Sequence, residues 1–162
     1  DSSKILIHSA YLGHYIADAH VPLHTTQNHN GQLTNQIGIH AFWESRLPEL
    51  FHKKYKLLTG RAIYLESPLN AAWSIVKHTN SLVDSTLSCE KKVSVKIKSS
   101  QLFEFSKRNH ALTRLYSYQY SNAYHNLMNG MVEGQMRKSI FNIGSFWYTA
   151  WVDAGQPTLE GF

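Results

Sequence analysis

The spacing of apolar residues predicts helices along most of the chain. Such residues recur at intervals of three and four over residues 3–19, 39–46, 67–87, 101–128 and 132–153, the fourth of which allows a break near Lys107. Ser67 and Pro68 suit the N-cap and the first position of a helix, and Gly155 suits the end of the last one. Because the alternation typical of strands is nearly absent, the sequence predicts an all-α helix bundle.

Two segments lack the helical pattern. Residues 25–38 are rich in Asn, Gln, Thr and Gly and predict a loop. In residues 93–98, apolar residues alternate with Ser and Lys, which fits either a short strand or an exposed basic connection. We favour the connection.

Composition indicates one globular domain over residues 1–162. The hydrophobic share of 43% and the charged share of 17% are typical of folded proteins and exclude a disordered chain. No apolar run is long enough to cross a bilayer, so we expect no stable membrane insertion, and the single Cys89 excludes an internal disulfide. The net charge of +5 suits an anionic partner but is common in soluble proteins. We interpret the lysines of residues 90–98 as a solvated loop rather than a nucleic-acid clamp.

Five residues in the first third of the chain have the types and spacing of a metal site. His14 and Asp18 are four residues apart on one predicted helix, so their side chains share a face with Cβ atoms about 5–6 Å apart. His40 and Glu44 repeat this spacing on the next helix, and His24 lies between the two pairs. One such pair usually makes only a helix-surface hydrogen bond, but two pairs that flank a further histidine predict a metal site. Zinc accepts imidazole and carboxylate ligands, as iron and manganese do.

The same residues allow a catalytic and a structural interpretation. A structural zinc site usually has four protein ligands, whereas His24, His40 and Glu44 supply three and leave a position open for reaction. A non-catalytic, metal-binding helical scaffold is the alternative. A carboxylate-bridged di-iron bundle would need a spacing of three residues between its Glu and His ligands, not four. We interpret the other histidines as surface or core residues, with His20 near the mouth of the site.

The stretch from Gly13 to Glu44 resembles the signature of the zinc-dependent phospholipase C and fungal single-strand nuclease superfamily. The resemblance is carried by the runs His-Tyr-Ile-Ala-Asp, Pro-Leu-His and His-Ala-Phe-Trp-Glu, which end at Asp18, His24 and Glu44. It implies an all-helical bundle in which up to three zinc ions share one cleft. Glutamate at position 44 is similar to the phospholipase branch, because the nucleases have aspartate there.

The resemblance also implies a role for each of the five residues. His14 and Asp18 would ligate a first zinc ion, and Asp18, our candidate catalytic residue, would also bridge to a third. His24, His40 and Glu44 would form the complete protein ligand set of the second zinc ion.

The implied activity is hydrolysis of a phosphodiester, either a phospholipid or single-stranded nucleic acid, by metal-activated water in a secreted or periplasmic protein. Members of the superfamily carry further zinc ligands in an N-terminal segment, and this chain has no counterpart for them before His14. We therefore expect a C-terminal fragment that lacks its N-terminal part, is incomplete as an enzyme, and has the missing segment as its partner.

Overall fold

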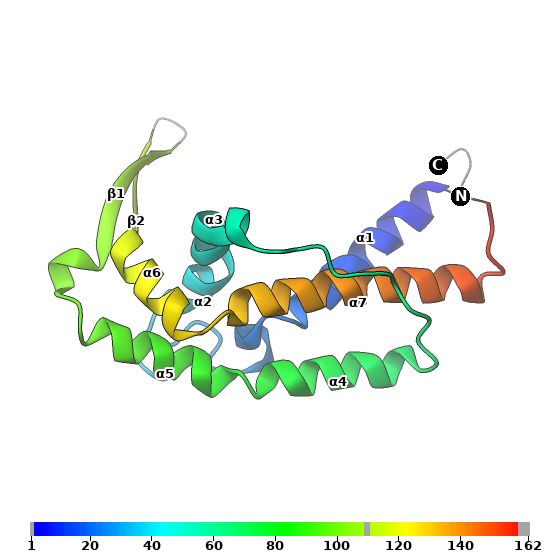
Figure 1. Cartoon of the computed structure of the whole chain (residues 1–162), viewed down its shortest axis with the longest axis horizontal. Helices are drawn as coiled ribbons and strands as arrows, with labels where there is room; N and C mark the ends of the chain where they lie inside the picture. The colour runs from blue at the N-terminus through cyan, green and yellow to red at the C-terminus, as the bar shows by residue number, and fades with distance from the viewer. Residues whose placement is uncertain (1, 109–110, 159–162) are drawn as a thin grey trace.

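The computed structural model describes residues 2–108 and 111–158 and is rich in helix without being all-α. About 63% of the chain is helical, and a two-stranded antiparallel sheet accompanies the helices. The expected all-α class is therefore wrong. The sheet consists of β1 (Phe103–Arg108) and β2 (Ala111–Tyr116), which form a hairpin that stands out from the helices (Figure 1).

The helical elements follow one another along the chain, with two long connections over residues 26–38 and 55–67. Their bounds are α1 (Ser2–Asp18), η1 (Pro22–Thr25), α2 (Ile39–Ala41), η2 (Phe42–Arg46), α3 (Leu47–Phe51), η3 (His52–Lys54), α4 (Pro68–Asn80), α5 (Val83–Ser94), η4 (Ser99–Gln101), α6 (Tyr118–Leu127) and α7 (Met131–Asp153). Here η1, η3 and η4 are 3-10 turns, whereas η2 is a single wide turn of π-helix.

The first and last predicted helices correspond to α1 and α7, but the predicted helix over residues 67–87 is two helices. Ser67 caps α4 as expected, because its Oγ accepts a hydrogen bond from the backbone of Asn70. The chain then turns at Ser81, where the Leu82 amide donates to the Thr79 carbonyl, and α5 begins. Residues 95–98 form a turn and a bend rather than a strand, but Val93 and Ser94 end α5 and Val93 is buried, so the favoured exposed connection holds only for the second part of residues 93–98.

The predicted helix over residues 101–128 is also wrong, because its first half is the hairpin. Phe103 and Phe105 alternate with polar residues, and bulky or β-branched residues dominate β2, so both segments suit a pleated ladder. Strand pairing runs from Phe103 opposite Tyr116 to Arg108 opposite Ala111. The second half is α6, which Ser117 caps by accepting a hydrogen bond from the amide of Tyr120.

The core lies where the short helices after residue 38 meet α5, α6 and the start of α7. Its side chains include Leu23, Ile39, Phe42, Trp43, Leu47, Phe51, Val93, Tyr120, Tyr124, Met128 and Val132. This core fixes η1, α2 and η2, the elements that carry His24, His40 and Glu44.

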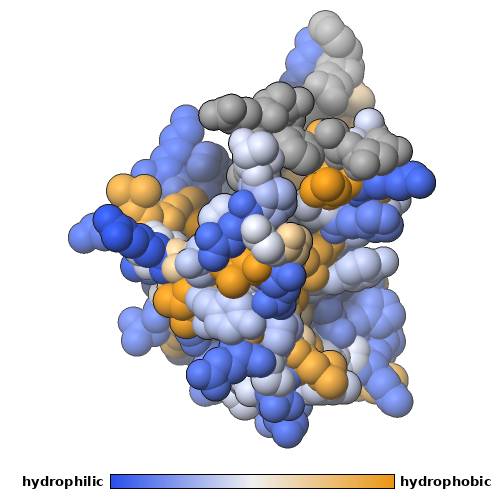
Figure 2. Space-filling model, turned by 90° about the vertical axis from the view of Figure 1, so that its right-hand side faces the viewer, coloured by the Kyte–Doolittle hydropathy of each residue, from blue (hydrophilic) through white to orange (hydrophobic). Residues whose placement is uncertain are grey.

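α1 packs along α7 at the end of the molecule that carries both termini (Figure 1). Gly13 makes this approach close, because a Cβ atom there would lie 3.0 Å from the indole of Trp147. Trp147 also donates from Nε1 to the carbonyl of Ser9 at 2.9 Å. Figure 2 shows apolar side chains at the surface of this end, mixed with polar ones. Among the described residues, no helix combines the length and the apolar character that crossing a membrane requires.

Candidate metal centre

Three of the five predicted ligands converge on one point. His24 and His40 approach through their Nε2 atoms at 2.9 Å, and the Glu44 Oε2 atom lies 3.2 Å from the first and 3.0 Å from the second. One ligand atom from each residue therefore lies within 4.8 Å of the others, a group that could hold a metal ion.

The separations agree with the size of a zinc site. Two ligand atoms at zinc–nitrogen distances of about 2.0–2.1 Å in tetrahedral geometry lie about 3.3 Å apart. The three observed separations of 2.9, 3.0 and 3.2 Å are slightly shorter than this. Only small side-chain movements would therefore be needed for all three atoms to contact one ion.

The other two predicted ligands extend this group on one side. Asp18 places Oδ1 3.6 Å from Nδ1 of His24 and Oδ2 3.4 Å from Nε2 of His14. The structure thus brings all five residues into one connected cluster, although His14 and Asp18 do not converge with the other three. The side chain of His14 is 67% exposed, so the cluster is open to solvent at this end.

His40 is oriented by a backbone group that sequence reasoning missed. Its Nδ1 lies 3.2 Å from the carbonyl oxygen of His29. When the Nδ1 proton is donated to this carbonyl, the lone pair of Nε2 points at the centre, which is the usual arrangement of metal-binding histidines. The sequence carries no signal for this contact, because every residue has a backbone carbonyl. The conformation of the loop brings the carbonyl of His29 to His40.

The loop of residues 26–38 is fixed by hydrogen bonds that the Asn28 side chain makes to the backbone and to another side chain of the loop. Asn28 accepts from the amide of Leu33 at 2.8 Å and donates to Thr34 at 3.0 Å. Gly31 has φ +75°, and a Cβ atom there would lie 2.3 Å from the carbonyl oxygen of Gln36. The loop that carries the His29 carbonyl to His40 therefore requires glycine at position 31.

Glu44 lies in the wide turn η2, which the apolar spacing did not predict. Such π-helical turns are rare and occur frequently at functional sites. The turn leaves Phe42 and Trp43 both buried while Glu44 points outward to the histidines.

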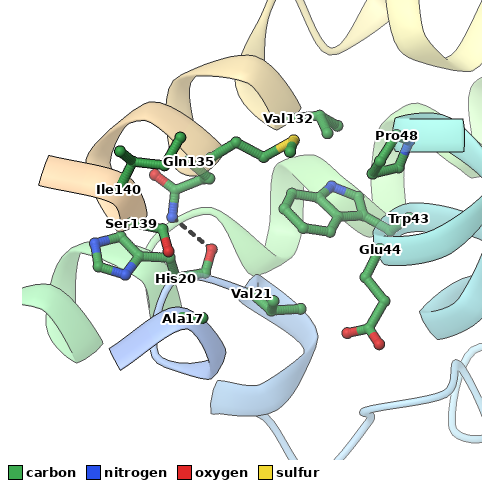
Figure 3. Close-up of a pocket in the computed structure, with 11 residues that line it drawn as sticks. Ala17, His20, Val21, Trp43, Glu44, Pro48, Val132, Gln135, Ser139 and Ile140 are labelled. Atoms are coloured by element: carbon green, nitrogen blue, oxygen red, sulfur yellow. Dashed lines mark hydrogen bonds between the residues drawn. The ribbon is translucent and has the colours of Figure 1, made fainter. Parts of the chain in front are cut away.

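An apolar pocket of about 260 Å³ adjoins the metal-site residues at Glu44. In Figure 3, the Trp43 indole extends into it between Val21 and Val132, and the Glu44 carboxylate points away from it. The Trp43 Nε1 atom is buried and has no hydrogen-bond partner among the residues that the structure describes. A buried donor without a partner is unfavourable, so this atom is a point of unsatisfied polarity in the pocket wall.

His20 was expected near the mouth of the site and is instead a buried part of this pocket wall. Its Nδ1 lies 2.7 Å from the Ile16 carbonyl and its Nε2 lies 2.9 Å from Nδ2 of Asn142, a pattern that suits a neutral ring. Burial lowers the pKa of His20. Gln135 donates to the His20 carbonyl at 2.8 Å, as drawn in Figure 3. These bonds tie the end of α1 to α7.

No family model, curated protein or solved structure matched the chain in comparisons with known proteins.

Proposed function

We propose that the chain is the metal-binding domain of a zinc-dependent phosphodiesterase, with zinc held by His24, His40 and Glu44. The observation that carries this proposal is the convergence of two imidazole nitrogens and one carboxylate oxygen within 4.8 Å. Two nitrogen ligands and one oxygen ligand suit zinc better than magnesium or calcium, which prefer oxygen alone.

The number of ligands supports catalysis over a structural role. Zinc in structural sites is usually closed by four protein ligands, whereas three protein ligands leave a position for water or substrate. His24 and Glu44 are exposed, so this position faces solvent.

In such a site, zinc supplies positive charge to the phosphoryl oxygens and lowers the pKa of a water molecule. Residues of this chain position the ligand side chains. The His29 carbonyl orients His40, and the Asp18 carboxylate lies 3.6 Å from Nδ1 of His24, on the side of that ring away from the centre. Asp18 remains our candidate catalytic carboxylate, and its side chain is 37% exposed at the open end of the cluster.

The pocket at Glu44 favours a phosphodiester with an apolar substituent. Its wall is made mainly of apolar side chains, among them Val21, Trp43, Val132 and Met136. A phospholipid offers both a phosphodiester for the metal centre and an apolar part for this pocket. Single-stranded nucleic acid is the second substrate class. It offers less apolar surface for this pocket to bind.

A non-catalytic metal scaffold is the competing proposal, and the five-residue cluster favours it in one respect. Asp18 on α1 connects through His24 on η1 to His40 on α2, so a bound ion would clamp several elements together. The two proposals differ in turnover and not in metal binding.

The test measures zinc content and hydrolysis together. We expect His24→Ala and His40→Ala to lose the zinc that the wild-type chain retains after dialysis, because two protein ligands hold the ion poorly against water. His8→Ala is the matched control, since His8 is exposed on α1 outside the cluster. Turnover of bis(p-nitrophenyl) phosphate, which should be weak in a chain that we expect to be incomplete as an enzyme, should depend on added zinc and on His24 and His40. Zinc binding without turnover of this ester, a short-chain phosphatidylcholine or single-stranded DNA would favour the scaffold, and unchanged zinc in both variants would refute the ligand set.

A further inference from the structure

The positive charge of the chain is concentrated in one segment. Residues 91–116 hold seven of the 16 Lys and Arg residues but only one of the 11 Asp and Glu residues. This segment therefore carries a net charge of +6, and the rest of the chain carries −1. It comprises the end of α5, η4 and the hairpin, at the opposite end of the molecule from the termini (Figure 1).

Strand register places apolar and cationic side chains on one face of the hairpin. Phe105 pairs with Arg114, and Lys107 pairs with Leu112. Paired residues and residues two apart share a face of an antiparallel ladder, so these four side chains lie together. All four are exposed, with Phe105 at 67% and Leu112 at 72%.

The base of the hairpin is anchored to the core. Glu104, the one acidic residue of the segment, accepts from the buried Arg46 at 2.6 Å. Tyr116 stacks on Phe42 with ring centroids 3.9 Å apart. The hairpin is therefore held at its base, and the acidic group is engaged there, away from the exposed cations.

We propose that this face, defined by Phe105, Lys107, Leu112 and Arg114, docks onto a membrane surface that contains anionic lipids. Phe105 and Leu112 enter the boundary between headgroups and acyl chains, and the cations contact the headgroups. Nucleic acid would match the cations and could stack on Phe105, but it offers no apolar phase for Leu112. The docking surface does not depend on the metal centre, although it would bring a lipid phosphodiester close to the protein.

The test is co-sedimentation of the full chain with vesicles. We expect strong partition onto phosphatidylcholine vesicles that contain phosphatidylserine, weak partition onto phosphatidylcholine alone, and weakening with added salt. Replacing Phe105 and Leu112 together by Ser should lower partition at least tenfold. Lys107→Gln should lower it about fivefold, the effect of one cation near an anionic surface.

Two matched controls lie outside the hairpin. Leu58→Ser removes an apolar side chain that is 95% exposed, and Lys53→Gln removes an exposed cation, so both should partition as the wild type does. Circular dichroism should show that every variant stays folded. Equal partition onto neutral vesicles, or hairpin variants that bind as the controls do, would overturn the proposal. Binding of single-stranded DNA through Lys107 without any vesicle binding would assign the face to nucleic acid instead.

Discussion

His24 is the residue on which the cluster depends, because both of its ring nitrogens face other members. Its Nε2 lies 2.9 Å from His40, and its Nδ1 lies 3.6 Å from the Asp18 carboxylate. A carboxylate on the outer nitrogen of a metal-binding imidazole fixes the tautomer and makes the inner nitrogen a stronger ligand. Asp18 would therefore affect zinc binding without being one of the three converging ligands.

Asp18→Asn tests this contribution. We expect the affinity for zinc to fall about 10- to 100-fold, as is usual when the partner of a metal-binding histidine is lost. Isothermal titration with zinc is the measurement, and Asp84→Asn, an exposed aspartate on α5, is the control. Equal affinity in the two variants would mean that the Asp18 carboxylate does not support His24.

A second effect at this scale concerns His125, which is far in sequence from the metal-site residues. Its Nε2 lies 2.7 Å from the hydroxyl oxygen of Tyr55, and burial lowers the pKa of His125. Because the unfolded chain then binds more protons, the free energy of unfolding should fall as the pH drops through about 6.5. His125→Gln should reduce this slope, measured by urea unfolding in the presence of a chelator, whereas His8→Gln should leave it as it is. An unchanged slope in His125→Gln would mean that His125 does not contribute.

Among the elements, those with strong local signals could be predicted from the sequence. The α1 and α7 helices follow a continuous apolar spacing, and the Ser67-Pro68 start of α4 has a sequence signature. The hairpin was missed because Leu112, Leu115 and Tyr116 fit helical spacing, although Phe103 and Phe105 alternate with polar residues as in a strand; packing of Tyr116 on Phe42 then holds the ladder at its base. The metal-site residues were chosen by type and spacing, whereas the wide turn η2 and the His29 carbonyl depend on backbone conformation that those signals do not encode.

The loop before α2 gives the sharpest test at the scale of elements. Gly31→Ala should destabilise the protein by about 1–3 kcal/mol, because alanine is strained at φ +75° and its Cβ would meet the Gln36 carbonyl. Zinc affinity should fall as well, since the loop carries the His29 carbonyl. Gly60→Ala is the control: Gly60 has φ +96° with nothing within 4 Å of the added atom, so it shows the backbone strain without the collision. Equal loss of stability and equal zinc affinity in the two variants would show that the loop does not position the centre.

At the scale of the whole molecule, a bound ion would add a direct link between elements that are otherwise held together by packing. The three ligands lie on η1, α2 and η2, and Asp18 adds the end of α1. A ligand that binds only the folded state stabilises it by about 2.7 kcal/mol at one hundred times its Kd. For a chain of this length, each kcal/mol raises Tm by about 2–4 °C, so zinc at that concentration should raise Tm by about 5–10 °C. Calorimetry with and without zinc measures the shift, which should vanish in His24→Ala and persist in His8→Ala. A wild-type Tm that does not respond to zinc would show that the three side chains converge without binding an ion.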